Sequence, residues 1–181
     1  FGYFAGGWSP GPGGPYHYKL TIIDRIDYSN DTATAVAKST ITSSRYYGSG
    51  AGNASYGYFA GGWTGSANVS TMDRLDYSSD TTAAASKGPL REGRSSMGAA
   101  GNGSFGYWCG GNAKTIVDRL DYSSDTSTAA AKGPLSQPRS NIGGTGNASY
   151  GYYAGGENPP SPTSRSTIDR IDYSNDTPTS S

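Results

Sequence analysis

The sequence predicts an all-β fold assembled from repeated units of short strands. An aromatic stretch that ends in a glycine pair recurs four times, as FGYFAGG, YGYFAGG, FGYWCGG and YGYYAGG. A phrase that alternates apolar and polar residues, DRIDY or DRLDY, follows each aromatic stretch. Helix signals are poor, because the alanine run at residues 129–131 is short and lies next to Gly133-Pro134.

The period of the repeat is close to 50 residues. The Asp-Arg pair that opens the alternating phrase recurs at spacings of 49, 45 and 51 residues. Twelve of the 14 acidic residues are three aspartates in each of four units, which a solvated low-complexity tract would not keep in register. We therefore expect one domain with units at roughly 1–38, 39–87, 88–132 and 133–181.

Each unit contains signals for four short strands. The aromatic stretch is rich in β-favouring residues, and its Gly-Gly can turn. The alternating phrase is the next strand, and SND or SSD after it is turn chemistry. A stretch such as TAAASKGPL is a weak strand that ends at Gly88-Pro89, and RSSMGAAG is a strand of small residues. A Gly-Asn pair before the next aromatic stretch is typical of a hairpin. Four short strands per unit favour a β-propeller blade.

Composition and charge exclude several classes of protein. The formal net charge is zero, with no basic stripe, so we expect no nucleic-acid partner. No apolar run approaches the roughly 20 residues of a membrane span. Aliphatic residues are few and glycine is frequent, with 28 residues, but 15 Tyr, 4 Phe and 3 Trp can supply a core. Cys109 is the single cysteine, so no intrachain disulfide is possible. The chain opens on Phe1 rather than Met, and we expect a fragment, a processed product or the ordered part of a longer chain.

The order of these features resembles the kelch repeat along the whole chain. That repeat places an arginine before a strand, then a strand that ends in Gly-Gly, a variable loop, a strand that ends in Tyr-Asp, a turn and a Trp. In the last unit, Arg139, Gly155-Gly156 and Asp172 match this pattern. The sequence departs from it in two ways. The expected Trp is absent, and the strand before Gly-Gly is aromatic, which moves aromatic rings toward the core. The positions expected to hold Trp are Ala33, Thr82, Ser127 and Pro178.

A narrower resemblance is to the long repetitive structural proteins of marine and cyanobacterial viruses, which share GYFAGG and DRIDYSNDT units. Related units also occur in bacterial surface proteins. The resemblance implies a fibre or an adhesin, at an extracellular or virion surface, with no enzymatic activity and no cofactor.

Repeated charges are expected to hold the units together. An arginine fork paired with a carboxylate is a strong, directional contact, so we expect the lone arginine of a unit to meet a Tyr-Asp phrase of the same or the next unit. The structural charges of this kind are Asp27, Asp76, Asp121, Asp172, Arg45, Arg94 and Arg139. The Asp-Arg pair of each alternating phrase is expected to serve cross-strand pairing.

No catalytic centre or metal site is evident in the sequence. The only histidine, His17, lies in the Pro-rich loop PGPGGPYHY. The phrase from Asp27 to Asp31 resembles an alternating oxygen-ligand loop for calcium, but its middle position is Ser and no Gly follows, which favours turn stabilisation.

The variable loops carry the candidate ligand contacts, Trp8, Tyr16, Tyr18 and Trp63. Aromatic side chains there suit stacking on sugar rings or contact with a partner. An equal alternative is that Trp8 and Trp63 cap the blade beneath the loop.

We expect a non-catalytic structural or adhesive protein, such as a viral fibre subunit that contacts a host glycan. The alternatives are a bacterial filament or adhesin subunit and a sugar-active propeller enzyme. The chain holds four Gly-Gly strands but only three connecting segments with the lone arginine, so the array either closes or is completed by another chain, which favours a homo-oligomer or polymer.

Overall fold

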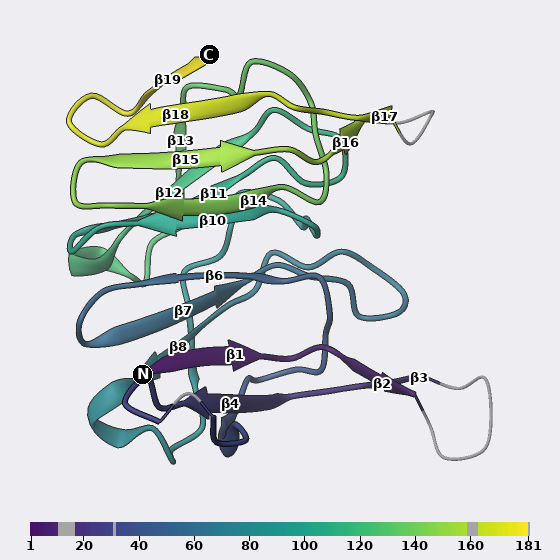
Figure 1. Ribbon diagram of the computed structural model, residues 1–181, viewed down its shortest axis with the longest axis vertical. Helices are drawn as coiled ribbons and strands as arrows, with labels where there is room; N and C mark the ends of the chain where they lie inside the picture. Colours follow the sequence, from purple (N-terminus) through teal and green to yellow (C-terminus); the bar gives the residue numbers. More distant parts are fainter. Residues whose placement is uncertain (11–16, 31, 159–162, 181) are drawn as a thin grey trace.

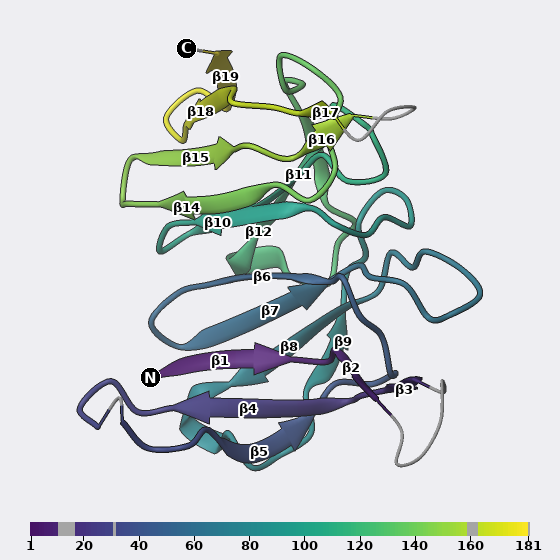
Figure 2. The ribbon, with the colours of Figure 1, turned by 45° about the vertical axis from the view of Figure 1, so that its right-hand side comes forward.

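The computed structural model describes residues 1–10, 17–30, 32–158 and 163–180, and they form an open stack of four antiparallel sheets (Figures 1 and 2). The two ends of the chain lie at opposite ends of the stack, and the described sheets do not close into a ring. The fold is all-β, as the sequence predicts, with two short 3-10 turns at Tyr77–Ser79 and Tyr122–Ser124.

Each sheet is built from one sequence unit. Sheet 1 contains β1 (Gly2–Ala5), β4 (Ile22–Ile26) and β5 (Val36–Thr40). Sheet 2 contains β6 (Ser49–Gly52), β7 (Tyr56–Ala60), β8 (Met72–Asp76) and β9 (Ala85–Lys87). Sheet 3 contains β10 (Gly98–Gly101), β11 (Phe105–Cys109), β12 (Val117–Asp121) and β13 (Ala130–Lys132). Sheet 4 contains β14 (Gly143–Gly146), β15 (Tyr150–Ala154), β18 (Ile168–Asp172) and β19 (Thr177–Ser180).

Two further hairpins and a loop project from the same side of the stack. They are β2 (Trp8–Pro10) with β3 (His17–Lys19), β16 (Glu157–Asn158) with β17 (Thr163–Ser164), and the loop at residues 61–71 (Figure 1). These segments lie between the Gly-Gly pair and the alternating strand, where the units differ most in length. The length of the repeat therefore varies in loops that project from a fixed frame of sheets.

Local sequence explains the tight turns within each unit. Between β6 and β7, the Asn53 side chain accepts hydrogen bonds from the backbone N–H groups of Ser55 (2.8 Å) and Tyr56 (2.9 Å), so the predicted Gly-Asn hairpin is confirmed. Both glycines of each Gly-Gly pair adopt positive φ, for example 65° at Gly61 and 112° at Gly62, a region that favours glycine.

The core lies between the sheets. One buried cluster fills each of the three interfaces, and its central side chains are Ile23 and Leu75, then Met72 and Trp108, then Tyr107, Tyr153 and Ile171. Stacked tyrosine pairs cross each interface, with ring centroids 4.7–4.8 Å apart: Tyr3–Tyr77, Tyr58–Tyr122 and Tyr107–Tyr173. The tyrosine that follows the alternating strand of the later sheet thus supplies aromatic packing across each interface.

A second repeated contact, which we call the aspartate junction, also crosses each interface. In the turn of sheet 3, Asp125 accepts hydrogen bonds from the hydroxyl of Tyr58 (3.0 Å) and the guanidinium of Arg74 (2.7 Å), and Lys87 Nζ lies 3.2 Å away. All three partners belong to sheet 2. Burial acts to raise the pKa of Asp125, but hydrogen bonds from Tyr58 and Lys87 and the two positive charges hold it below its usual range.

The aspartate junction recurs at the other two interfaces. Asp80 meets Tyr3, Arg25 and Lys38, and Asp176 meets Tyr107, Arg119 and Lys132. The arginine of the Asp-Arg pair therefore contacts the next unit. The predicted cross-strand contact is also present, because the guanidinium of Arg74 lies over the Tyr56 ring of the paired strand β7, 4.4 Å from its centroid, and Arg119 lies over Phe105 in the same way.

Candidate functional site

A groove lined by aromatic rings lies beside the β2–β3 hairpin. Its volume is about 350 Å³, and its walls come from three segments that are distant in sequence. The lining residues are Trp8, Lys19, Tyr46, Tyr47 and Gly65. Trp8 and Tyr47 are 48% and 56% exposed, so their rings are open to a ligand.

The groove is held in shape by hydrogen bonds between its walls. Tyr46 exchanges backbone hydrogen bonds with Trp63, at 2.8 and 3.2 Å. Lys19 Nζ donates to the carbonyl of Thr64, which ties the hairpin to the loop at residues 61–71. The rings of Tyr46 and Tyr47 meet edge to face, with centroids 4.7 Å apart. The aromatic walls are therefore fixed by the backbone around them.

Tyr47 has an unusual backbone conformation. Its φ is 59°, in the left-handed region, where bulky residues are rare. Ser96 and Asn141 occupy the same position in the next two units, with φ of 59° and 55°. These three positions are linked by backbone hydrogen bonds. Ser96 donates its N–H to the carbonyl of Tyr47, and Asn141 donates its N–H to the carbonyl of Ser96, each at 2.8 Å. The fold therefore imposes the conformation, and only the first of the three positions places an aromatic ring there.

The structure brings together part of the predicted contact set. Trp8 lines the groove, whereas Tyr18 on β3 is 58% exposed outside it. Trp63 is partly buried and does not line the groove, but its backbone bridges to Tyr46 and Asn68 tie a wall residue to the loop at residues 61–71. Tyr16 lies outside the described residues.

Sequence reasoning missed Tyr46 and Tyr47, although a signal for them exists. They follow Arg45 directly, where the other units have Ser95-Ser96 and Ser140-Asn141. A departure from the repeat toward aromatic residues, in one unit only, marks this position as serving something other than the scaffold.

The predicted structural arginines are buried, but their partner differs from the expected one. Arg45 lies 2.7 Å from Asp73 and Arg94 lies 2.5 Å from Asp118, and Arg139 pairs with Asp169 in the same way. These aspartates open the alternating phrase, and all three are fully buried. The arginine and its partner belong to the same sheet, so this ion pair fixes the small-residue strand to the rest of its own sheet.

The strand-end aspartates, Asp27, Asp76, Asp121 and Asp172, do not meet these arginines, and the prediction that they do is wrong. Each stabilises a turn instead. Asp76 accepts hydrogen bonds from the N–H (2.9 Å) and hydroxyl (2.7 Å) of Ser78, and these bonds hold its pKa below the usual range. The same pattern joins Asp27 to Ser29, Asp121 to Ser123 and Asp172 to Ser174. Position in the strand explains the difference, because the strand-end side chain lies beside its own turn.

Two candidates for chemistry are placed by the fold. His17 is the first residue of β3 rather than part of a loop. Cys109 is fully buried on β11, and burial raises the pKa of its thiol.

Within the described residues, no three side chains of His, Cys, Asp or Glu gather where they could hold a metal ion. No helix in that part of the chain has the length and hydropathy needed to cross a membrane.

The fold and the groove together define the class of protein. It is an all-β protein of stacked repeats with an aromatic groove beside the β2–β3 hairpin. No protein-family model and no curated protein matches the chain. A solved structure described as "Structure of YjhT" has a similar fold, with a TM-score of 0.73 over 90% of this chain and 12% sequence identity. This chain spans about half of that protein, 52% of its length. At this identity, the similarity concerns the fold alone.

Proposed function

We propose that this chain is a non-catalytic structural and adhesive repeat protein, displayed on a viral appendage or a cell surface, whose kelch-like units are propeller blades. Its groove beside the β2–β3 hairpin would contact a surface glycan. The observation that carries this proposal is the aromatic groove itself. Trp8 and Tyr47 present exposed rings, and Tyr47 does so from a backbone conformation that disfavours a bulky residue.

The distribution of charge supports a scaffold. The buried arginine–aspartate pairs hold sheets 2, 3 and 4 together, and the aspartate junctions join successive sheets. Most of the charges that repeat from unit to unit therefore take part in contacts that hold the fold together. The groove, in contrast, is built from residues that differ between units, as expected of a surface for recognition.

The chemistry of the groove suits a carbohydrate. Sugar rings present C–H faces that stack on Trp and Tyr, and their hydroxyls need nearby donors and acceptors. Tyr46 and Tyr47 contribute phenol groups, and Lys19 contributes an ammonium at the edge.

A glycan array with three variants tests this proposal. Tyr47→Asn removes the ring and installs the residue that occupies the same position in the last unit, so the fold is preserved. Trp8→Ala removes the opposite wall. Tyr18→Ala removes an equally exposed tyrosine of the same hairpin that does not line the groove, and it is the matched control.

We expect the wild type and Tyr18→Ala to bind the same glycans. The two groove variants should lose about fivefold or more in affinity, because loss of one stacking aromatic side chain costs ~1–3 kcal/mol where bases are the ligand. Binding that survives in both groove variants, or a wild type that binds no glycan, would refute the proposed contact.

Assembly into a homo-oligomer or polymer is part of the proposal, with a second copy stacked head to tail. All of β14 is exposed, whereas the equivalent strand β10 is largely buried by sheet 4. Phe4 is 59% exposed, whereas the equivalent Trp108 and Tyr153 are fully buried. A heterologous contact of β14 with Phe4 of another copy would repeat the internal interfaces. Sedimentation that shows a monomer at high concentration would refute it, and Phe4→Ser is expected to weaken association.

A further inference from the structure

The inner edge of sheet 1 lacks a strand that every other sheet has. In sheets 2, 3 and 4, the aromatic strand pairs on one side with the alternating strand and on the other with a strand of small residues. In sheet 1, β1 pairs with β4, and no described strand lies along its other edge. The backbone groups on this edge can therefore accept another strand.

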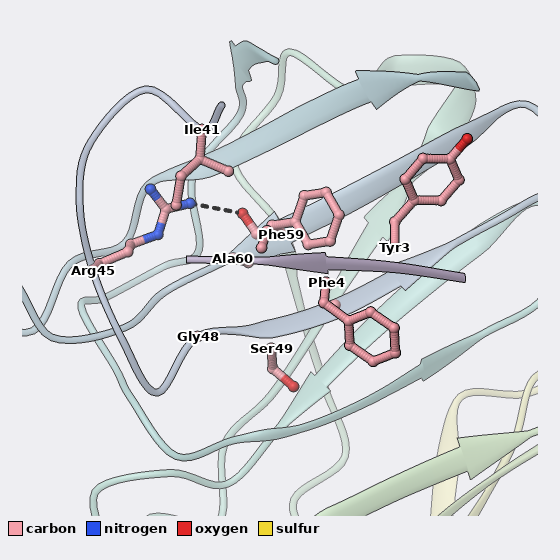
Figure 3. A pocket seen from close by; sticks show the side chains of 10 residues that line it. Tyr3, Phe4, Ile41, Arg45, Gly48, Ser49, Phe59 and Ala60 are labelled. Atoms are coloured by element: carbon pink, nitrogen blue, oxygen red, sulfur yellow. Dashed lines mark hydrogen bonds between the residues drawn. The ribbon is translucent and has the colours of Figure 1, made fainter. Parts of the chain in front are cut away.

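A cavity of about 350 Å³ lies where the missing strand would run. It is lined by Tyr3–Ala5 of β1, by residues 48–50 at the start of β6, and by Ile41, Arg45, Phe59 and Ala60. Figure 3 shows the Tyr3 and Phe4 side chains on β1; Ser49 and Phe59 lie on the neighbouring strands β6 and β7, which pair with each other.

The exposure of one repeated aromatic side chain shows that this space is filled at the other interfaces. Phe59, Trp108 and Tyr153 occupy the same register position, each opposite the first aspartate of the alternating strand. Trp108 and Tyr153 are fully buried because the small-residue strand of the preceding sheet covers them. Trp108 Nε1 donates to the carbonyl of Ser49 on β6, and the Tyr153 ring packs against Gly98 on β10. Phe59, which faces sheet 1, is only partly buried.

A carboxylate in sheet 1 also lacks the arginine that its equivalents have. Asp24 lies opposite Phe4 on β4, as Asp73 lies opposite Phe59 on β8. Asp73, Asp118 and Asp169 each bind an arginine that precedes the small-residue strand. Among the described residues, Asp24 forms no such ion pair. An open strand edge, an uncovered ring and an unpaired carboxylate thus coincide at one place.

We propose that this edge binds an extended polypeptide segment with an arginine four residues before a strand of small residues. The spacing is that of Arg45 to Ser49, Arg94 to Gly98 and Arg139 to Gly143. The segment runs antiparallel to β1, with its four small residues opposite Gly2–Ala5. Its arginine pairs with Asp24, and its strand covers Phe59.

Small residues are required because the inner strands approach closely. A Cβ at Gly144 of β14 would clash with the backbone of Ala99 on β10. The occupant is therefore a strand rich in Gly, Ala and Ser, and its arginine gives it specificity for this edge.

The first experiment titrates a synthetic peptide with the sequence of residues 87–104 into the protein. The protein carries Phe59→Trp, which installs the residue found at the equivalent position 108 and reports on burial. We expect a blue shift of the Trp fluorescence and amide NMR shifts along β1. Replacing the peptide arginine that corresponds to Arg94 with Met, or Asp24→Asn in the protein, is expected to weaken binding roughly tenfold or more. Making both changes is expected to weaken binding little further.

A second experiment removes the entropic cost of peptide association. The same segment is fused directly to Phe1, which is equivalent to Phe105, so the junction reproduces the natural sequence before β11. We expect a higher thermal midpoint for the fusion, and a smaller increase for the fusion with Met in place of its arginine. Asp24→Asn is expected to remove that difference.

Three results would overturn the proposal. The first is a fusion no more stable than the parent chain. The second is an arginine effect that persists in Asp24→Asn, since the arginine would then act elsewhere. The third is self-association of the parent chain that covers Phe59 and that the peptide does not inhibit, which would assign this edge to a second copy.

Discussion

The buried carboxylate of Asp118 is expected to depend on two arginines at once. Its Oδ2 lies 2.5 Å from Arg94 Nη2, and its Oδ1 lies 2.5 Å from Arg91 Nε. Arg94 and Asp118 are fully buried, whereas the Arg91 side chain is 37% exposed. The two cations therefore differ in solvation while they share one acceptor.

Magnitudes follow from this geometry. Arg91→Ala removes the more exposed partner and should cost about 0.5–1 kcal/mol, as for a surface ion pair. Arg94→Met removes a buried partner, which typically costs ~3–5 kcal/mol, but Arg91 still compensates the carboxylate, so we expect about 2–3 kcal/mol. The double variant leaves Asp118 without a cation and should cost about 5 kcal/mol, which exceeds the sum of the two single costs by roughly 1–2.5 kcal/mol.

Urea denaturation of the four proteins measures the cycle, provided that the m-value is unchanged. Arg45→Met is the control, because its partner Asp73 has no second arginine among the described residues. Without Arg45, Asp73 keeps only neutral donors from Thr42, whose hydroxyl lies 2.7 Å from Asp73 Oδ1. We expect Arg45→Met to cost more than Arg94→Met. Strictly additive costs in the cycle, or a loss below about 1 kcal/mol for Arg94→Met, would refute the reasoning.

Three further outcomes are expected. Tyr47→Asn should leave the free energy of unfolding unchanged or higher, because Asn tolerates the left-handed region better than Tyr; a loss above about 1.5 kcal/mol in thermal denaturation would contradict this. The aspartates of the three junctions have folded-state pKa values below their unfolded ones. Their contribution to stability is therefore present above the unfolded pKa and is lost as the pH falls through the folded pKa; Asp125→Asn should flatten the acid limb of stability against pH. Cys109 should resist thiol reagents in the native state and react only as fast as the protein unfolds, whereas rapid labelling would show that it is accessible.

The positions of most strands can be predicted from the sequence, because the patterns that indicate them are local and recur in each unit. The aromatic strands, the alternating strands and the Gly-Asn hairpins all lie where these patterns predict them. The partners of the buried arginines cannot be predicted from the sequence in the same way. Each unit offers its buried arginine three aspartates, and sequence spacing does not say which one faces the inside of the sheet. The sequence pattern favours the strand-end aspartate, whereas in the structure the arginine pairs with the first one, for example Asp73 for Arg45.

The candidate groove was only half predictable. Trp8 was found because it lies in a variable loop. Tyr46 and Tyr47 lie in a connecting segment, and only the backbone pairing of Tyr46 with Trp63 brings them to that loop. Such a meeting of three segments depends on the stacking of sheets 1 and 2, which the local pattern does not encode.

The aspartate junction has a consequence for how such a chain can evolve. At each of the three junctions, a unit gives a tyrosine, an arginine and a lysine to the unit after it, which receives them through a single aspartate, as Asp125 does. Duplication or loss of one whole unit by recombination between the repeats would therefore leave every remaining aspartate with its full set of donors. A crossover that removed part of a unit would leave a junction aspartate buried without its positively charged partners. Selection should accordingly permit changes in gene length in steps of whole units.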